Sequence, residues 1–353
     1  MPHRLVGDPA TLPRVDGAHR ELWEPLWKLR ISLQDVEVEL LRTPDLRRLH
    51  YLRHNGSAYV ATAHTYSRLQ HTLGVFALVA HLRQDDTVLR VAALLHDVGH
   101  APFSHTLETI DGVDHHAWTA KRVRSSSIAG VLARHAIVPD DVLQLVDGER
   151  HSLLRNTDAK LQCDHLDSFV RSAATRGILA WDPQWLLSRL VADEFALRFD
   201  TDAAELMAEL IVEEAAFHLG AANIATGVAL RELVRALLAR GQTTLDELAD
   251  MTDARLETLL LEHRTTRAGA WRLFYEPHRL RVRTIGEDDE GSGAELDPTI
   301  RIDRLYLAMP HDEHGGILRR SLRLRSLVDE LERRLGRYAV EGLLPPEPVP
   351  PRR

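Results

Sequence analysis

The chain of 353 residues contains a single cysteine, Cys163, and aromatic residues make up only 5% of it. One cysteine excludes an intramolecular disulfide and a cysteine-rich zinc site, and it suits a reducing compartment. No stretch approaches the roughly 20 apolar residues of a membrane-spanning helix, and residues 1–20 lack the apolar run of a signal peptide. We therefore expect a cytoplasmic protein that does not bind membranes.

Basic residues are fewer than acidic ones, because 44 Lys and Arg against 52 Asp and Glu give a formal net charge of −8. This balance argues against a broad nucleic-acid surface, although a local basic patch can still hold a small anionic ligand. Histidine is abundant instead, with 20 residues, several of them between His50 and His116. Histidine is the commonest metal ligand and titrates near neutral pH, so this cluster points to metal or acid–base chemistry.

Low aromatic content leaves Leu, Ala and Val to build the core, which favours helices. Apolar residues recur at helical spacing in six segments. These are residues 67–82, 88–95, 158–172, 203–216, 228–240 and 318–335. After Gly241 the pattern changes, and residues 280–285 and 300–303 alternate with period two, which predicts two strands.

Changes in composition and in apolar periodicity along the chain set the expected boundaries between its parts. We predict a mainly α protein in which a helical bundle carries a smaller C-terminal α+β region with a few strands. The predicted parts are an N-terminal segment 1–39, a helical core 40–240, an accessory α+β region 241–343 and a proline-rich disordered tail 344–353. Within the accessory region, the acidic, Gly/Ser-rich residues 286–295 are expected to form an exposed loop.

A polar group interrupts the apolar pattern at the end of the second predicted helix, where His96 and Asp97 directly follow two leucines. Burying an imidazole and a carboxylate without partners would cost several kcal/mol, whereas a divalent cation accepts both as ligands. His71 lies on the preceding predicted helix and Asp164 on a later amphipathic one. Three helices can therefore converge on one metal ion held by His71, His96, Asp97 and Asp164.

Two stretches carry a family resemblance: Ser67-Arg-Leu-Gln-His-Thr-Leu-Gly-Val75 and His96-Asp-Val-Gly-His-Ala-Pro-Phe-Ser-His105. The pattern His, His-Asp and Asp resembles the HD-domain metal-dependent phosphohydrolases and is closest to the branch that contains deoxynucleoside triphosphate triphosphohydrolases. The resemblance implies an HD-domain helical bundle that binds one or two cations of Mn, Fe, Co, Ni or Zn through the four ligands named above.

Further roles are carried over from the family residue by residue. Arg68 matches an arginine that contacts phosphate, and His100 and His105 fall where family histidines approach the phosphate group. The motif around Trp118-Thr119 aligns His115 with a catalytic acid or base, and Glu108 is the carboxylate expected to orient it. The adjacent His116 is the alternative for that role.

The departures from the family lie on the substrate side. Relatives carry Tyr and Asp where this chain has Ser168 and Ser172, so two hydrogen bonds to a deoxyribose are missing. His165 stands where the family has a basic phosphate contact, and His54 replaces a glutamine of the substrate pocket. This contrast between a retained metal site and an altered sugar pocket predicts a changed choice of substrate.

The resemblance thus implies a metal-dependent phosphohydrolase acting on a small phosphorylated substrate, in the first place a nucleotide. Cleavage of a deoxynucleoside triphosphate to the deoxynucleoside and triphosphate is one possibility, and hydrolysis of a different phosphate ester is another. A non-catalytic nucleotide-binding regulatory protein is the alternative from a different class. Relatives commonly form homo-oligomers, so self-association is expected too, without a predicted stoichiometry.

Overall fold

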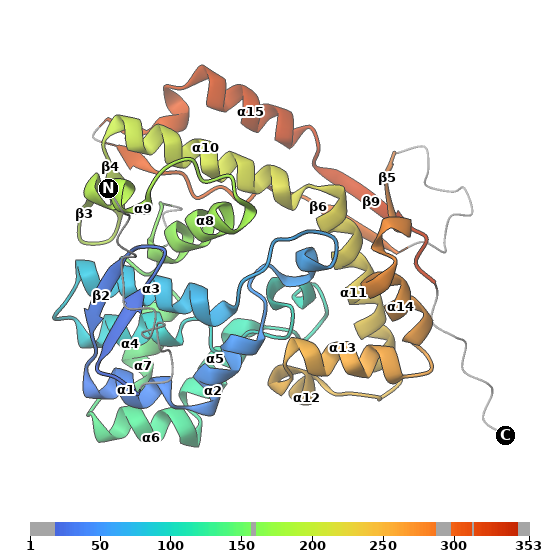
Figure 1. The fold of residues 1–353 in the computed structure, drawn as a ribbon, viewed down its shortest axis with the longest axis horizontal. Coiled ribbons are helices and arrows are strands. Elements are labelled where there is room, and N and C mark those ends of the chain that lie inside the picture. Colours follow the sequence, from blue (N-terminus) through green and yellow to red (C-terminus); the bar gives the residue numbers. More distant parts are fainter. Residues whose placement is uncertain (1–17, 157–159, 287–297, 313, 345–353) are drawn as a thin grey trace, which may run out of the picture.

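The computed structural model describes residues 18–156, 160–286, 298–312 and 314–344 (Figure 1). The longer helices are α3 (Arg68–Leu82), α4 (Thr87–Leu95), α8 (Cys163–Arg176), α10 (Thr201–His218), α11 (Ala221–Ala239), α13 (Asp253–Glu262) and α15 (Leu322–Glu332). The shorter ones are α1 (Asp35–Leu41), α2 (Pro44–Arg48), α5 (His115–Val123), α6 (Ser126–Arg134), α7 (Pro139–Val146), α9 (Pro183–Ser188), α12 (Leu245–Asp250) and α14 (Arg267–Tyr275). No helix among these residues combines the length and apolarity needed to cross a membrane.

Three small sheets accompany the helices. The first is an antiparallel hairpin of β1 (Glu21–Glu24) and β2 (Leu29–Ser32). The second has the order β3 (Leu190–Ala192), β4 (Leu197–Phe199), β7 (His311–Asp312) and β8 (Gly315–Gly316). In the third, β9 (Gly336–Glu341) lies between β5 (Arg281–Ile285) and β6 (Thr299–Ile302) and is antiparallel to both.

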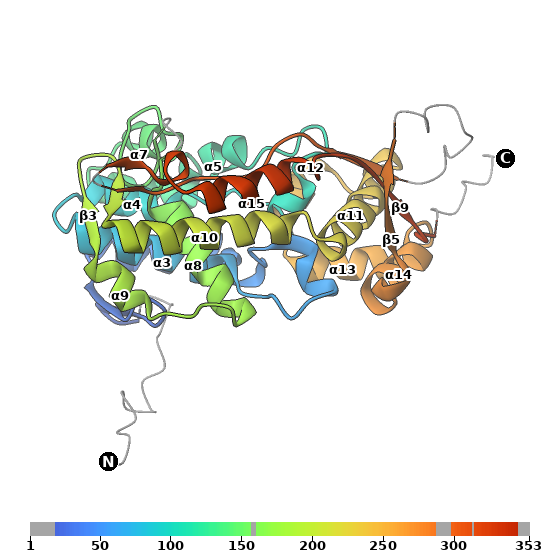
Figure 2. The same ribbon diagram turned by 90° about the horizontal axis from the view of Figure 1, so that it is seen from above.

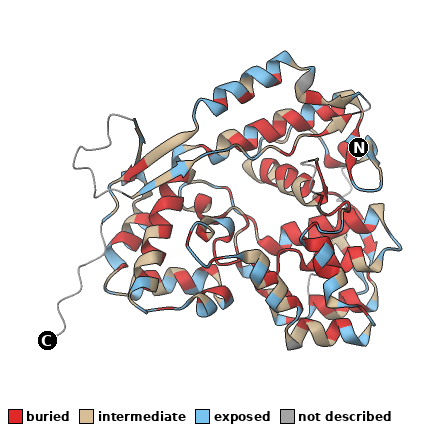
Figure 3. Ribbon diagram, turned by 180° about the vertical axis from the view of Figure 1, so that it is seen from behind, coloured by how far each residue is buried: buried red, intermediate tan, exposed pale blue. Residues whose placement is uncertain are grey.

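The core is divided into three clusters of buried apolar side chains. The largest lies among α3, α4, α7 and α8 and includes the N-terminal hairpin. A second cluster joins residues 101–113 to α11, α13, α14 and β9. A third lies between α10 and α15, which run side by side in Figures 1 and 2. Figure 3 shows that the outer face of α15 is exposed, so this helix forms the edge of the molecule.

The helices that carry the predicted ligands begin at well-defined caps. The hydroxyl of Ser67 accepts a hydrogen bond from the backbone N–H of Gln70, and the backbone N–H of Ser67 donates one to the Gln70 side chain, which together form a capping box at the start of α3. Asp86 caps α4 through the N–H of Leu89 at 2.9 Å. These caps fix where each helix starts, and therefore which residues face α8.

The mainly α fold class is confirmed, and both strands predicted in the accessory region are present as β5 and β6. The predicted helix at 158–172 was placed too early, because α8 begins only at Cys163. Just before it, the carbonyl of Leu161 accepts the N–H of Leu197, which holds that residue in a non-helical conformation. The hairpin β1–β2, the sheet of β3, β4, β7 and β8, and the central strand β9 were missed. Apart from their first residues, the predicted loop 286–295 and tail 344–353 lie outside the described residues.

Gly74 on α3 provides a stability test. A Cβ at this position would lie 1.9 Å from Oδ1 of Asp167 and 2.3 Å from Nη2 of Arg171. We expect Gly74→Ala to lower the free energy of unfolding by about 1–3 kcal/mol, because overpacking must displace this buried ion pair. Chemical denaturation measures the change.

The matched control is Gly130→Ala on α6, where the added Cβ meets nothing closer than 3.8 Å. This variant should be as stable as the wild type or up to about 1 kcal/mol more stable, because alanine favours a helix over glycine. Equal effects of the two substitutions would contradict the packing argument.

Candidate metal centre

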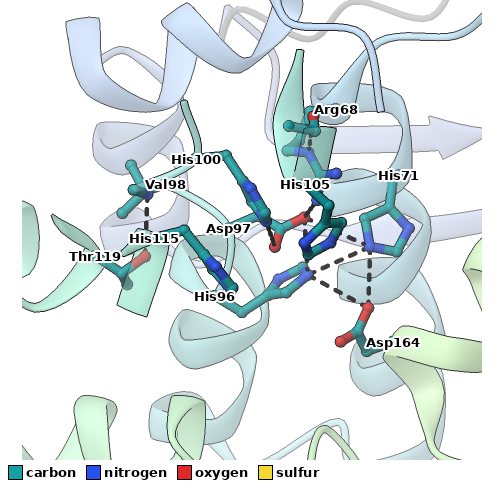
Figure 4. A network of polar contacts seen from close by, with 12 residues as sticks. Arg68, His71, His96, Asp97, Val98, His100, His105, His115, Thr119 and Asp164 are labelled. Atoms are coloured by element: carbon teal, nitrogen blue, oxygen red, sulfur yellow. Dashed lines mark hydrogen bonds and ion pairs between the residues drawn. The ribbon is translucent and has the colours of Figure 1, made fainter. Parts of the chain in front are cut away.

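Four predicted ligands from three parts of the chain converge on one point (Figure 4). His71 comes from α3, Asp164 from the first turn of α8, and His96 and Asp97 directly follow the last residue of α4. Nε2 of His71 lies 3.4 Å from Nε2 of His96, 3.1 Å from Oδ1 of Asp164 and 3.6 Å from Oδ2 of Asp97. Nε2 of His96 lies 3.4 Å from Oδ2 of Asp97 and 3.8 Å from Oδ1 of Asp164.

These spacings fit a bound transition metal. Metal–nitrogen and metal–oxygen bonds are about 2.0–2.2 Å long, so neighbouring donor atoms on one cation lie roughly 3 Å apart. The histidine tautomers fit as well. Nδ1 of His71 lies 2.9 Å from Oδ2 of Asp167, and Nδ1 of His96 lies 2.8 Å from the carbonyl of Ala93. Both Nδ1 atoms face acceptors, so each Nε2 would be the atom available to a cation.

Asp167 orients the first ligand, a role that was not predicted from the sequence. Its carboxylate is fully buried and accepts hydrogen bonds from Nε1 of Trp27 at 2.7 Å, from His71, and from Nε and Nη2 of Arg171 at 2.9 and 2.8 Å. Arg171 is held in turn by Glu24 at 2.8 Å. The signal in the sequence was the helical spacing of Asp164, Asp167 and Arg171, which places a second carboxylate and a cation beside the ligand.

The charged groups of the site shift one another's pKa values. Burial lowers the pKa of His71, but hydrogen bonds to Asp164 and Asp167 outweigh it and raise this pKa to about 9. Burial raises the pKa of Asp164, but the hydrogen bond from His71 and the charge of His96 hold it well below its usual range. Asp97 is held low in the same way, against burial, chiefly by Arg68. Both carboxylates are therefore ionised, and cation binding is expected to release a proton from His71.

Arg68 lies behind Asp97 and is 1% exposed. Its Nη1 donates to Oδ2 of Asp97 at 2.6 Å, its Nε to Oγ of Ser104 at 2.9 Å, and its Nη2 to the carbonyl of His54 at 3.0 Å. These contacts position a metal ligand. These three bonds use one N–H each of Nε, Nη1 and Nη2. The predicted contact of Arg68 with phosphate would have to use the second N–H of Nη1 or of Nη2.

On the opposite side of Asp97 lies a second group of ionisable side chains. Nε2 of His100 lies 3.1 Å from Oδ1 of Asp97, and its ring stacks on that of His115 at 4.2 Å between centroids. Glu108 accepts from Nδ1 of His115 at 2.6 Å and from Nδ1 of His105 at 2.9 Å. Burial acts to raise the pKa of Glu108, but these hydrogen bonds hold it far below its usual range. The ionised Glu108 thus orients the imidazole rings of His105 and His115 by accepting from their Nδ1 atoms.

The comparisons with known proteins agree with this geometry. A family model described as HD domain matches residues 68–172, which include all four candidate ligands. Residues 68–172 of the chain thus carry an HD domain. The predicted divalent-metal cofactor is supported by this domain and by the histidine and carboxylate donors, neither of which names the element.

Several curated proteins are similar over part of their length. Metal-dependent phosphohydrolase cns2 of Cordyceps militaris is 27% identical over 199 residues, 54% of this chain and 53% of that protein. Deoxynucleoside triphosphate triphosphohydrolase SAMHD1 of Homo sapiens is 31% identical over 93 residues, 22% of this chain and 15% of that protein. The match thus spans about half of the first relative and much less of the second.

Solved structures share the fold over nearly the whole chain. A hypothetical protein from Aquifex aeolicus superimposes with a TM-score of 0.68 at 18% identity and covers 91% of this chain and 95% of its own. A phosphohydrolase from Bacteroides thetaiotaomicron gives a TM-score of 0.65 at 17% identity, with coverage of 91% and 99%. The likeness therefore extends beyond the HD domain into the C-terminal region.

Two predicted substrate contacts lie next to the ligands. His54 packs against His71 at 4.2 Å between ring centroids, and its Nε2 lies 3.2 Å from Oγ of Ser168. His165 follows the ligand Asp164 on α8 and contacts the hydroxyl of Tyr306. Tyr306 belongs to the C-terminal region, in which no functional residue was predicted from the sequence.

The role of Asp167 can be tested through metal affinity. We expect Asp167→Asn to weaken Mn²⁺ binding by about 10- to 100-fold, because an amide cannot accept all the hydrogen bonds that orient His71. Titration calorimetry well below the melting temperature measures this. The control is Asp246→Asn, an exposed carboxylate paired with Lys121, which should leave the affinity unchanged. Equal Mn²⁺ affinity of the two variants would contradict the orienting role.

Proposed function

We propose that this protein is a metal-dependent phosphohydrolase that acts on a nucleotide. The observation that supports this most directly is the position of Asp97, whose two oxygens face different groups. Oδ2 lies among the candidate metal-ligand atoms, and Oδ1 lies 3.1 Å from Nε2 of His100. His100 belongs to the His–Glu cluster, which consists of His100, His105, Glu108 and His115. A phosphate group bound at the metal would therefore lie beside imidazoles suited to neutralising its oxygens and moving a proton.

The chain's own residues divide this work. A divalent cation held by the four ligands supplies polarisation of the phosphate and activation of water. His115 donates its Nδ1–H to Glu108, so its Nε2 is the atom that takes or gives a proton. His100 and His105 would stabilise negative charge on the phosphoryl oxygens, and the side chain of His105 is 59% exposed. Arg68 keeps Asp97 in place.

The similarity to SAMHD1 supports a nucleotide, and cleavage of a deoxynucleoside triphosphate is the specific form of the proposal. The alternative substrate is a different phosphate ester, which Ser168 and Ser172 in place of the family Tyr and Asp favour. A non-catalytic nucleotide-binding regulator is the second alternative. The cytoplasmic location and self-association stay predictions.

Product analysis tests the activity. Purified protein with Mn²⁺ is incubated with deoxynucleoside and ribonucleoside triphosphates, nucleoside monophosphates and a generic phosphomonoester, and the products are separated by chromatography. We expect a deoxynucleoside and intact triphosphate, or inorganic phosphate from one of the other substrates, and loss of either product in Asp97→Ala.

The outcomes separate the alternatives. Turnover that survives Asp97→Ala with full metal content would show that the site is wrongly assigned. Tight nucleotide binding without product under Mn²⁺, Fe²⁺, Co²⁺, Ni²⁺ or Zn²⁺ would favour the regulatory protein over the hydrolase.

The His–Glu cluster makes a separate prediction. We expect Glu108→Gln to lower kcat by about 10²-fold while metal content stays at the wild-type level, because an amide no longer holds His115 in the required tautomer. Elemental analysis and steady-state kinetics on the same preparation measure both quantities. Loss of the metal together with activity would instead make Glu108 part of the metal site.

A further inference from the structure

The face of α8 that leads away from the metal is occupied by the protein's own side chains. Ser168 and Ser172 follow the ligand Asp164 at helical spacing on this face. Oγ of Ser168 contacts His54, and Oγ of Ser172 donates to Glu214 at 2.6 Å. Both partners are buried, with exposed fractions of 8% and 4%.

The rest of that face is closed in the same manner. Nε2 of His64 lies 3.2 Å from Oγ of Ser172, and its ring packs edge-on against Phe217 at 5.1 Å. Tyr66 stacks on His54 at 5.0 Å and is 6% exposed. Ser172 is 1% exposed and offers no surface on which to seat a sugar or base, while Ser168 is half-buried beside His54. This face of α8 therefore leaves little room for the organic part of a substrate.

A strap from the C-terminal region provides the alternative position. Residues 303–310 connect β6 to β7 without regular secondary structure. Leu305, Leu307 and Met309 pack against the apolar cluster of α10 and α15. This alternation turns the residue between the two leucines, Tyr306, towards α8, since side chains along an extended segment point to opposite sides in turn.

Tyr306 is fixed beside the metal ligands and yet open to solvent. Its hydroxyl contacts Nε2 of His165, the residue after Asp164, and its ring lies 5.2 Å from that of His165 and 6.2 Å from that of Phe169. The residue as a whole is 54% exposed. An aromatic ring tied at its hydroxyl end, with free surface next to a metal centre, can stack on a planar ligand.

Positive charge flanks this ring. Arg304 lies two residues before Tyr306 and is exposed, and within the described residues it forms no ion pair. Arg155 is close enough for its charge to act on the Tyr306 hydroxyl, and its Nη2 lies 3.4 Å from Nε2 of His116. A ligand that combines a planar ring with phosphates would match both features.

We propose that Tyr306 is a specificity-determining residue, on whose ring the base of the nucleotide substrate stacks while the phosphates reach the metal ligands. This inference rests on the proposed function and names where its substrate is recognised. The base lies on the C-terminal strap and not along Ser168 and Ser172. The strap, outside the matched HD domain, thereby selects nucleotides over simple phosphate esters.

The test compares a nucleotide with a phosphate chain that lacks a base. Binding of dATP and of inorganic tripolyphosphate is titrated calorimetrically with Mn²⁺ in the Glu108→Gln background, where turnover is slow, and KM for dATP is measured with Glu108 intact. We expect Tyr306→Ala to weaken dATP binding and raise its KM roughly 10- to 100-fold, as loss of a stacking partner does. Tripolyphosphate binding should change less than about threefold.

Two further variants isolate the ring. Tyr306→Phe keeps the ring and should stay within about threefold of the parent for dATP, whereas Tyr306→Leu keeps apolar bulk and should behave like Tyr306→Ala. Tyr275→Ala removes an equally exposed tyrosine on α14 and should have no effect. Thermal melts confirm that each variant is folded at the assay temperature.

The results that overturn the inference differ from those that overturn the function. Unchanged dATP binding in Tyr306→Ala, or equal losses for dATP and tripolyphosphate, would refute stacking even if the enzyme hydrolyses nucleotides. Failure of the parent to bind dATP would refute it as well. Absence of any hydrolysis by the wild type, with stacking intact in the binding assay, would refute only the proposed activity.

Discussion

The hydrogen bond between Asp167 and His71 is the contact on which the rest of the site depends. It joins α8 to α3 at the depth of the metal ligands, and it sets the tautomer of the first ligand. A buried carboxylate needs further compensation, which Trp27 and Arg171 supply. The helices can approach closely enough for this arrangement only because position 74 has no Cβ. The close packing at Gly74, the Asp167–Arg171 ion pair and the orientation of His71 therefore depend on one another.

The two sides of Asp97 divide the site into a half that holds the candidate metal ligands and a half that holds His100, His105, Glu108 and His115. In the first half His71 and His96 are buried while the Asp164 side chain is 30% exposed, and in the second half His100 is buried while the His105 side chain is 59% exposed. Each half therefore has one open side. Arg68 is directed at protein atoms because a buried carboxylate such as Asp97 needs a cation beside it.

The C-terminal region is structurally part of the site. Asp253, at the start of α13, accepts the backbone N–H groups of Phe103 and Arg53 at 2.8 Å each and is 1% exposed. Phe103 has a positive φ of 56°, a conformation that an aromatic residue keeps only when its surroundings hold it. Burial raises the pKa of Asp253 to about 6 despite these hydrogen bonds. The loop that carries His100 and His105 is thus held by a carboxylate from beyond the HD domain, and the same region supplies Tyr306.

The sequence by itself determined the helical class, the two alternating strands and the four candidate ligands, because helical periodicity and a His-Asp pair after an apolar helix are local patterns. It also placed Glu108 near His115 through the family motif. It did not reveal the role of Asp167 in holding His71, the filling of the α8 face by His54 and Glu214, or the approach of Tyr306 to His165. Those depend on contacts between residues far apart in the chain, and only the packing of the helices brings them together. Periodicity reports which side of a helix is buried, whereas the tertiary structure decides what it is buried against.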